Sequence, residues 1–419
     1  MITIVDGFST GAELASHLHR LGVPCAHVQS QPGVHPFLRR TFDPIHYRRD
    51  HGFVADVEEL AARLKHDGVR RIVAGTESGV TLAETLSSML GLPTNSEQRT
   101  ARRDKHLMAA AVSSSGLATP RTHLASSPAD AAQWFYDSGL SEAVVKPVDS
   151  AGSDGVTFCR TPVEVGDAAS SVLASRTVFG RQNRAVLVQE RLLGVEFYIN
   201  TVSLEGDHRV AETWRYTKQT RPGGGPIYDY EEPVQATSEE AGLLRKFTFA
   251  VLDALGIRNS PAHTEVMLTA DGPVLIETGA RLGGATAPAV VERHCGMSQT
   301  ALAAAALATP ADFYAFDDCR LTWPGVLRNV EFINHRRGLA DRNAMLRAAD
   351  LPSTVAVCPA VEHGEPLQPT TDLLSTPGFL YLAAGSRDQV DRDYALLRQW
   401  EGQGLHTGDM AVPVGSARS

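Results

Sequence analysis

The sequence predicts a multidomain protein of the α/β and α+β classes that opens with a Rossmann-like domain. Its 419 residues exceed the usual length of one domain and suggest about two to four domains. The first 96 residues alternate strand and helix patterns, which is typical of a parallel sheet with crossover helices. A later stretch, His263 to Gly284, begins with the pattern of a β-hairpin, so the C-terminal part is expected to mix antiparallel strands with helices.

Residues 1–96 are expected to form the Rossmann-like domain, because Pro93 and the polar residues after it end the alternating pattern. The expected strands and helices of this domain lie at residues 2–7, 11–21, 24–29, 57–66, 70–75 and 80–90. Gly7 and Gly11 flank the first turn, but the sequence G-x-G-x-x-G is absent, so no dinucleotide site is predicted there.

Residues 97–192 are expected to form a central subdomain, and residues 193–419 a C-terminal subdomain with an extension. In the central part we expect helices at 97–113 and 128–136, and strands at 143–148, 156–159 and 185–190. An Ala-rich helix at 299–307 is followed by a segment that reads as short strands and loops. The chain after about Gly402 reads as a loose tail.

The composition narrows the class of partner. A formal net charge of −9 without a basic stripe argues against nucleic acid. Five scattered cysteines without a C-x-x-C pair indicate neither a disulfide framework nor a zinc site. Apolar runs are too short to cross a membrane and the N-terminus lacks a signal-peptide pattern, so a cytoplasmic protein is expected. Its partners should be small molecules or protein, and a homodimer is left open.

The hairpin late in the chain is expected to hold two carboxylates face to face. Its strands are joined by Ala-Asp-Gly, which reads as a three-residue loop. If Thr269 pairs with Pro273, Glu265 lies opposite Glu277 with side chains about 5 Å apart. Such carboxylates repel unless one is protonated or a cation lies between them, and Mg²⁺ prefers carboxylate oxygens. A register shifted by one residue would instead leave one glutamate in solvent.

Two lysines are candidate phosphate ligands. Lys146 lies in an apolar strand and is followed by a loop containing Gly152 and Gly155. A buried ammonium needs an anion, and glycines expose backbone N–H groups, so together they describe a phosphate clamp. A lysine at a strand end before a solvated turn is the alternative. Lys105 near a helix start is either a second cation of the site or an exposed helix-face lysine.

Further carboxylates are candidate ligands of a small molecule. Glu190 and Glu196 flank a connection between strands, where backbone groups can meet an adenine edge and a carboxylate can accept hydrogen bonds from ribose hydroxyls. Surface glutamates beside a turn are the alternative. Glu77 follows a strand at the position where open α/β sheets bind ligands, or belongs to a helix-capping loop.

Basic residues around a glycine-rich loop are candidates for gripping a substrate carboxylate, with solvated surface charges as the alternative. These residues are Arg215, Lys218 and Arg221. His263 shares a strand face with Glu265 and is either a structural histidine or a ligand.

Several of these features follow one another along the chain: Lys105, Lys146-Pro147, the SAGSDGV loop, VQERLLGVEF and the ending ETGARLGG after Glu265. In this order they resemble the ATP-grasp superfamily. The likeness spans about residues 101–284 and implies an ATP-grasp fold after the Rossmann-like domain. The ending resembles that of L-amino-acid ligases, which make dipeptides. D-Alanine ligases and carboxylases usually show E-I-N-x-R there, with the Asn as a further metal ligand. Gly279 stands in its place, so water or phosphate oxygens would complete the metal shell.

The resemblance implies roles for most of these residues. Lys105 and Lys146 would bind ATP phosphates, with the loop residues Ser150, Gly152, Ser153 and Gly155 closing over them. Backbone groups of Glu190, Arg191 and Leu192 would hold adenine, and Glu196 would hold ribose. Glu265 and Glu277 would carry Mg²⁺ or Mn²⁺. Arg281 would face an acyl phosphate, and Gly284 with the small residues after it would leave room for the acyl donor.

The expected function is therefore an ATP-dependent carboxylate–amine ligase. It would join two amino acids, or an amino acid and an amine, with release of ADP and phosphate, in specialised peptide or antibiotic biosynthesis. Lys146 would neutralise the anions that must meet, and Arg281 would stabilise the oxyanion that develops on amine attack. The alternatives are an ATP-grasp carboxylase or purine-pathway-type ligase, and a nucleotide-binding protein without catalysis.

Overall fold

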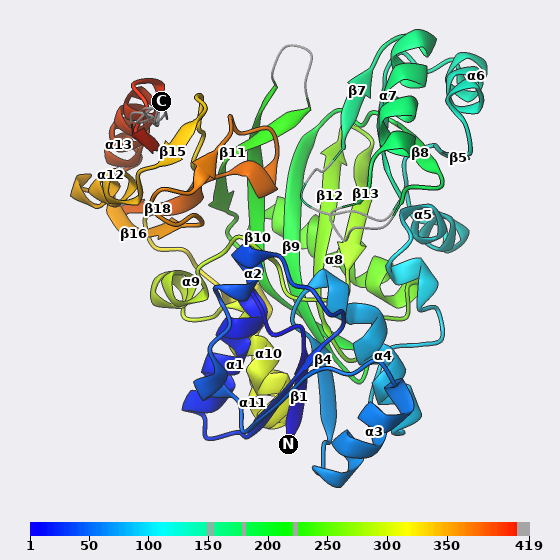
Figure 1. Cartoon of the computed structure of the whole chain (residues 1–419), viewed down its shortest axis with the longest axis vertical. Helices are drawn as coiled ribbons and strands as arrows, with labels where there is room; N and C mark the ends of the chain where they lie inside the picture. The colour runs from blue at the N-terminus through cyan, green and yellow to red at the C-terminus, as the bar shows by residue number, and fades with distance from the viewer. Residues whose placement is uncertain (149–151, 153–154, 178–181, 221–224, 409–419) are drawn as a thin grey trace, which may run out of the picture. The chain divides into compact units, whose positions relative to one another are not determined.

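The computed structural model describes residues 1–148, 152, 155–177, 182–220 and 225–408. The chain divides into two compact units (Figure 1). The first comprises residues 1–216 and 233–324, and the second comprises residues 217–232 and 325–419. A helix of the length and apolar character needed to span a membrane is not found among the described residues.

The first unit opens with a parallel sheet, as the alternating pattern predicts. The strand order is β3-β2-β1-β4 and all neighbours are parallel. The bounds are Ile2–Val5 (β1), Cys25–Gln29 (β2), Arg49–Phe53 (β3) and Arg71–Ala74 (β4). The helices are α1 (Thr10–Arg20), α2 (Pro36–Arg39), α3 (Val57–His66) and α4 (Val80–Met89). Strand β3 was not predicted, because its sequence RDHGF is polar and it lies at the sheet edge.

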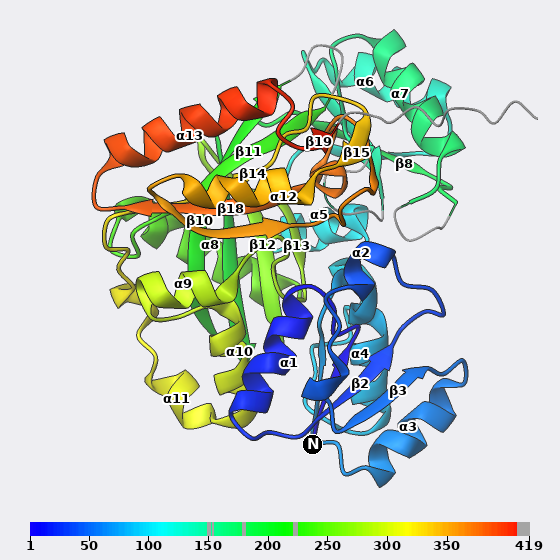
Figure 2. The same ribbon diagram turned by 60° about the vertical axis from the view of Figure 1, so that its left-hand side comes forward.

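Both faces of this sheet are covered. Ile4 and Val73 pack into the cluster that contains Leu14 of α1. Their strand neighbours Val5 and Ile72 point the other way, into the cluster that α3 and α4 complete. Figure 2 shows α1 and α3 on opposite sides of the strands. A parallel sheet of this kind carries its ligand-facing residues in the loops after the strands.

A four-stranded antiparallel sheet follows and carries Lys146. Its order is β5-β8-β6-β7, with bounds Thr122–Ala125 (β5), Ala143–Pro147 (β6), Thr157–Cys159 (β7) and Val186–Glu190 (β8). Helices α6 (Pro128–Ser138) and α7 (Pro162–Ala174) lie side by side next to it (Figure 1) and share its apolar core.

The helix expected at 97–113 begins later than predicted. A 3-10 turn, η3 (Thr100–Arg102), comes first, and the α-helix proper is α5 (Lys105–Ser114). Asp104 caps α5, because its carboxylate accepts hydrogen bonds from the N–H groups of His106 and Leu107. Lys105 is therefore the first residue of the helix.

A larger antiparallel sheet supplies the hairpin. Within the first unit its order is β13-β12-β9-β10, with bounds Val195–Leu204 (β9), Asp207–Thr220 (β10, which continues into the second unit), Pro261–Thr269 (β12) and Gly272–Gly279 (β13). Helix α8 (Glu239–Ala254) shares a core cluster with Phe197 and Val266. Their neighbours Tyr198 and Glu265 consequently point to the opposite face of the sheet. The unit ends with α9 (Pro288–Cys295), α10 (Gln299–Ala308) and α11 (Pro310–Ala315).

The second unit contains more regular structure than the sequence suggested. Its main strands follow the order β11-β14-β18-β16, with bounds Pro226–Pro233 (β11), Val326–Glu331 (β14), Thr354–Pro359 (β16) and Gly378–Ala384 (β18). Helix α13 (Arg387–Gly402) was missed, because its sequence is strongly charged and buries few apolar side chains, among them Val390 and Leu397. Helix α12 (Arg342–Leu346) and strands β15 (Gly338–Ala340), β17 (Pro366–Leu367) and β19 (Thr407–Gly408) complete it.

The loose tail expected after Gly402 is wrong as far as residue 408. Strand β19 pairs with Leu339 and Ala340 of β15, and His406 is fully buried. The buried imidazole explains why residues 402–408 are not a loose tail, because its Nε2 lies 2.9 Å from the Glu401 carboxylate. The remainder of the predicted tail, residues 409–419, lies outside the described residues.

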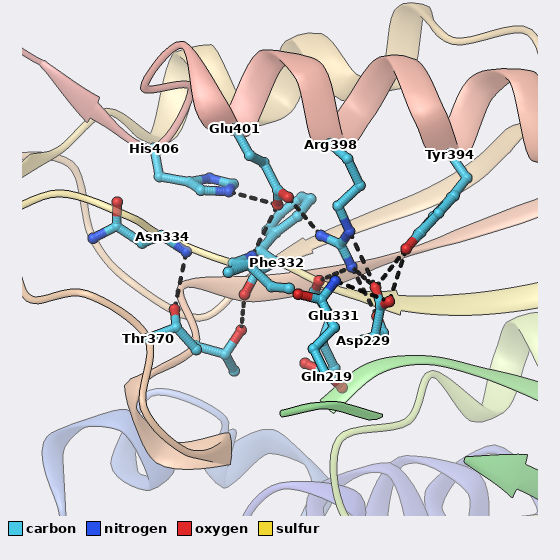
Figure 3. Close-up of polar contacts among 12 residues, drawn as sticks. Gln219, Asp229, Glu331, Phe332, Asn334, Thr370, Tyr394, Arg398, Glu401 and His406 are labelled. Atoms are coloured by element: carbon cyan, nitrogen blue, oxygen red, sulfur yellow. Dashed lines mark hydrogen bonds and ion pairs between the residues drawn. The ribbon is translucent and has the colours of Figure 1, made fainter. Parts of the chain in front are cut away.

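Helix α13 is tied to its sheet by buried charges (Figure 3). Arg398 pairs with the carboxylates of Asp229 and Glu401. Burial would raise the pKa of Glu401, but Arg398 and His406 hold it below its usual range. Neither carboxylate oxygen of Glu331 has a hydrogen-bond partner, and burial together with nearby Glu231 raises its pKa well above the usual range. Glu331 is thus a carboxyl that the fold favours in the neutral form.

Candidate functional site

The hairpin of β12 and β13 places Glu265 directly opposite Glu277, as predicted, although its loop and strand pairing differ from those expected. The loop has two residues rather than three, since Thr269 pairs with Gly272 and not with Pro273. A bulge between the two halves of the hairpin then shifts the register by one residue and restores the expected pair. The two errors in the predicted register cancel.

The two carboxylates have different neighbours. Glu277 lies 3.0 Å from Nζ of Lys105. Glu265 accepts a hydrogen bond from the Tyr216 hydroxyl at 3.3 Å and lies 3.6 Å from Nε2 of His263. His263 is itself held by Asn200, with its Nδ1 2.8 Å from Oδ1. Both glutamates are partly exposed, at 14% and 26%. Two opposed carboxylates that solvent can reach form a donor set that suits a hard divalent cation.

Lys146 is buried in β6, as its apolar surroundings predict. Burial lowers the pKa of its ammonium to about 8; Glu277 opposes that shift and Lys105 adds to it. Glu265 and Glu196 also oppose the shift, so their carboxylates lie within electrostatic reach of the ammonium. Two lysines and three glutamates therefore gather around one region, a distribution that suits a polyanion bound together with a cation.

The glycine-rich loop after β6 is described only in part. Gly152 and Gly155 have φ angles of 69° and 67°, a left-handed conformation that glycine adopts at little cost. Ser150 and Ser153, also predicted to bind phosphate, lie outside the described residues. The phosphate role of this loop stays a prediction.

The segment from Glu190 to Leu192 connects β8 towards β9. The backbone N–H groups of Glu190 and Arg191 donate to carbonyls of Arg121 and Glu142, so the predicted adenine contacts rest on the other backbone groups of this segment. The Glu190 carboxylate accepts hydrogen bonds from Arg121, and the Arg191 side chain pairs with Glu142. Glu196, the predicted ribose ligand, lies one residue into β9 and is partly exposed.

Glu77 lies between two guanidinium groups. It opens the 3-10 turn η2 (Glu77–Gly79) after β4, and Nε of Arg281 donates to its Oε2 at 2.8 Å. Arg103 donates to its other oxygen. Burial would raise the pKa of Glu77, but Arg103 and Arg281 hold it at about 2, so the carboxylate is charged throughout the neutral range. Among the described residues, the ion-pair partner of Arg281 is thus Glu77, which is distant from it in the sequence.

The loop after β13 is fixed from several sides. Thr10 donates to the carbonyl of Gly283, and the N–H of Gly283 donates to Gln299 at 2.8 Å. A Cβ atom on Gly283 would lie 2.8 Å from Oδ1 of Asn200, so the glycine lets this polar side chain pack against the backbone. Gly284, a predicted substrate residue, is exposed next to this fixed segment.

The other predicted substrate residues have different surroundings. Arg215 is half exposed and lies 4.0 Å from Glu240 of α8. Since Tyr216 points to Glu265, its strand neighbour Arg215 points to the opposite face of the sheet, away from the opposed glutamates. Lys218 lies over the ring of Tyr228 at 4.4 Å. Arg221 lies outside the described residues.

Sequence reasoning missed three residues that contact this region: Arg103, Tyr216 and Asn200. Arg103 lies two residues before Lys105, but its sequence context does not single it out. The alternation of β10 carried a usable signal for Tyr216, because it places this tyrosine on the face opposite to its neighbour Arg215.

The chain is similar to known proteins in sequence and in fold. A profile of the ATP-grasp domain matches residues 141–289, which include β6, the glycine-rich loop and the hairpin. Dapdiamide A synthase of Enterobacter agglomerans is 32% identical over 97% of this chain and 97% of its own length. A phosphoribosylamine–glycine ligase of Methanothermobacter thermautotrophicus is 30% identical over 36% of this chain and 37% of its own.

Solved structures share the fold at lower sequence identity. An L-amino acid ligase from Bacillus licheniformis superposes with a TM-score of 0.75 at 18% identity, covering 95% of this chain and 96% of that one. A carboxyaminoimidazole ribonucleotide synthase from Aspergillus clavatus, solved with ATP, gives 0.70 at 13% identity, covering 96% and 98%. Because a relative 32% identical spans nearly the whole chain and the domain profile matches its middle, this chain belongs to the ATP-grasp family of ligases.

Proposed function

We propose that this ATP-grasp ligase joins the carboxylate of one amino acid to the amine of a second amino acid or of another amine. The bond would form through an acyl phosphate, with release of ADP and phosphate. The observation that carries the proposal is the opposed pair Glu265 and Glu277 with Lys105 and Lys146 beside it. Lysines suit phosphate oxygens and opposed carboxylates suit a cation, so the site is built for a metal–nucleotide complex.

The first half of the reaction needs charge neutralisation. A substrate carboxylate that attacks the γ-phosphate of ATP is an anion approaching an anion, so the ammonium groups of Lys105 and Lys146 lower the barrier by holding the phosphate oxygens. When bound, Mg²⁺ would withdraw charge from those oxygens. The products of this step are the acyl phosphate and ADP.

The second half needs oxyanion stabilisation. The attacking amine adds to the acyl carbon and forms a tetrahedral oxyanion; the collapse of this intermediate expels phosphate and the nitrogen loses a proton. Arg281 would stabilise that charge, since Glu77 holds its guanidinium and a guanidinium is a permanent, planar cation. Phosphate leaves with the oxygen that came from the substrate carboxylate.

Glu265 and Glu277 are the residues that would hold the metal, Mg²⁺ or Mn²⁺. Their opposed oxygens suit a hard cation. The ammonium of Lys105 lies 3.0 Å from Glu277 and provides a positive counter-charge to it. Gly279 cannot serve as a side-chain ligand, so phosphate oxygens or water would complete the shell. Glu196 and the segment from Glu190 to Leu192 would bind the nucleoside, and the loop with Ser150, Gly152, Ser153 and Gly155 its phosphates.

The amino-acid substrates and the biosynthetic setting follow from the relatives. One relative is named as a dapdiamide A synthase and a structural neighbour as an L-amino acid ligase. We therefore assign amino acids as substrates, in specialised peptide or antibiotic biosynthesis in the cytoplasm. Glu77 and Gly284 border the place where an acyl donor would lie next to Arg281.

The division into residues 1–96, 97–192 and 193–419 remains part of the proposal. In it, the first part contributes Glu77, the second contributes both lysines and the third contributes both metal-binding glutamates.

An assay of phosphate release tests the proposal. The protein is incubated with ATP, Mg²⁺ and pairs of amino acids, and phosphate is measured against mixtures that lack one amino acid. Release that depends on both amino acids is expected. Phosphate release that depends on bicarbonate instead would favour a carboxylase. This is the second candidate function, because the chain shares its fold with a carboxyaminoimidazole ribonucleotide synthase. Nucleotide binding without release in any mixture would contradict a ligase.

A further inference from the structure

A glycine is needed at position 279 because there is no room for a side chain, and not because of the backbone conformation. It stands where the resemblance to other ATP-grasp enzymes predicts an asparagine, and it is not among the described glycines with a positive φ angle. A Cβ atom on Gly279 would lie 2.5 Å from Oε2 of Glu77 and 3.4 Å from Nε of Arg281. The volume that a side chain would occupy is therefore filled by the carboxylate of Glu77.

That carboxylate connects three separate segments of the first unit. Glu77 comes from the turn after β4, Arg103 from the residues before α5, and Arg281 from the loop after β13. All three side chains are largely buried, with exposed fractions of 18%, 13% and 16%. Arg281 also donates from Nη1 to the carbonyl of Leu282 at 2.7 Å. Two nitrogens of its guanidinium are thus engaged, which fixes both its position and its plane.

Arg103 keeps the cluster cationic. A carboxylate paired with Arg281 alone would cancel the charge that an oxyanion needs. With Arg103 on the second oxygen of Glu77, the three side chains carry one negative and two positive charges. The carboxylate can therefore orient Arg281 without removing the net positive charge of the cluster.

We infer that Gly279 and Glu77 act as one unit that positions Arg281. The missing side chain at position 279 lets the Glu77 carboxylate reach over the end of the hairpin and hold the guanidinium that faces the acyl carbon. Glu77 is a positioning residue in this arrangement, and Gly279 is the gap that admits it. The inference rests on the proposed role of Arg281 and adds the residues that make this role possible.

A side chain at position 279 and the present position of Glu77 exclude each other, so an asparagine there would displace the carboxylate. The atom that a new Cβ atom would meet is the far end of a flexible side chain, which can rotate away. A Gly279→Ala variant should consequently fold, with Glu77 turned aside and Arg281 released.

The test compares Gly279→Ala, Glu77→Gln and the double variant with the wild type in the ligation assay. Each single change is expected to lower kcat by about tenfold to a hundredfold, because a misplacement of about 1 Å at a reacting centre costs that much. KM for ATP should stay within about twofold, since neither residue meets the nucleotide. The double variant should be no slower than the slower single variant, because both changes break the same contact.

The control is Gly242→Ala in α8, where a Cβ atom meets nothing within 4 Å, and it should retain wild-type kcat. Wild-type kcat in Gly279→Ala would overturn the inference. So would losses that multiply in the double variant, or a rise in KM for ATP as large as the fall in kcat.

Thermal melts of the wild type, Gly279→Ala, Glu77→Ala and the double variant of these two changes keep the inference testable if the wild type ligates no amino acids, which would contradict the proposed function alone. Gly279→Ala should lower the melting temperature in the wild-type background, and by clearly less beside Glu77→Ala, where the carboxylate is gone. Equal shifts in both backgrounds would show that the two positions do not meet and would overturn the inference.

Discussion

Lys146 should make ATP binding depend on pH in the alkaline range. Burial lowers the pKa of its ammonium to about 8, although Glu277 opposes that shift. The charged fraction then falls from about nine tenths at pH 7 to about one tenth at pH 9. Bound phosphate favours the ammonium and raises its pKa, so binding takes up a proton and weakens as the pH rises through about 8. We expect the affinity for ATP to fall about tenfold between pH 7 and pH 9.

Titration calorimetry with ATP at a series of pH values measures this effect. The matched variant is Lys146→Arg, since a guanidinium keeps its charge over the whole range. Its absolute affinity will differ, because an arginine does not fit the place of a lysine, but its slope against pH should be nearly flat. The variant also reports any contribution from the ionisation of ATP itself. An affinity of the wild type that is constant over this range, or a variant with the same slope, would refute the reasoning.

Three further predictions concern carboxylates and their partners. Glu277→Gln should lower kcat by about a hundredfold or more while the protein stays folded, because a metal ligand worth several kcal/mol is lost without opening a cavity; kcat and circular dichroism measure this. Arg102→Met should lower the free energy of unfolding in urea by about 3–5 kcal/mol, because Arg102 pairs with buried Glu84 at 2.7 Å and the carboxylate would lose its counter-charge and keep only the hydrogen bond from Asn95. Glu331→Gln should raise the free energy of unfolding at neutral pH, whereas Glu401→Gln should lower it.

The opposite signs of the last pair follow from proton linkage. The raised pKa of Glu331 means that the wild type loses stability as the pH rises from the unfolded value, about 4.3, through the folded one. The lowered pKa of Glu401 gives stability that is present above the unfolded value and is lost as the pH falls through the folded one. Both variants should therefore approach the wild type at low pH. Destabilisation of similar size by both at neutral pH would contradict the assignment.

Controls decide the other two predictions. Arg63→Met removes an exposed pair with Glu59 and should change the free energy of unfolding by less than about 1 kcal/mol. A loss as large as that of Arg102→Met would show that the burial of the pair does not matter. Unchanged kcat of Glu277→Gln at limiting Mg²⁺ would remove Glu277 from the metal site.

The sequence predicted those parts of the fold in which local pattern and burial agree. The parallel sheet, the buried Lys146 and the opposition of Glu265 and Glu277 are all present in the structure. Strand β3 and helix α13 were missed, because their sequences are mostly polar or charged and show no clear apolar pattern. The hairpin register was reached through the wrong loop, since a bulge cannot be seen in a pattern of period two.

The contacts of the candidate site were harder to predict than its residues. Glu77, Arg103 and Arg281 are far apart in the sequence, and only the fold brings them together. Gly279 was noticed as a missing metal ligand, but a glycine in a sequence does not reveal what fills its place. The same limit applies to Asn200, whose contact with His263 spans two strands that are distant in the sequence.

The central claim, that an amino-acid carboxylate is activated as an acyl phosphate and passed to an amine, can be tested by following one oxygen atom. The protein is given ATP, Mg²⁺ and pooled amino acids labelled with oxygen-18 in their carboxylates, and the products are analysed by mass spectrometry. The account predicts a new dipeptide or amide, an equal amount of ADP, and phosphate that carries one labelled oxygen. Unlabelled phosphate beside the new amide, or AMP with pyrophosphate in place of ADP, would contradict it.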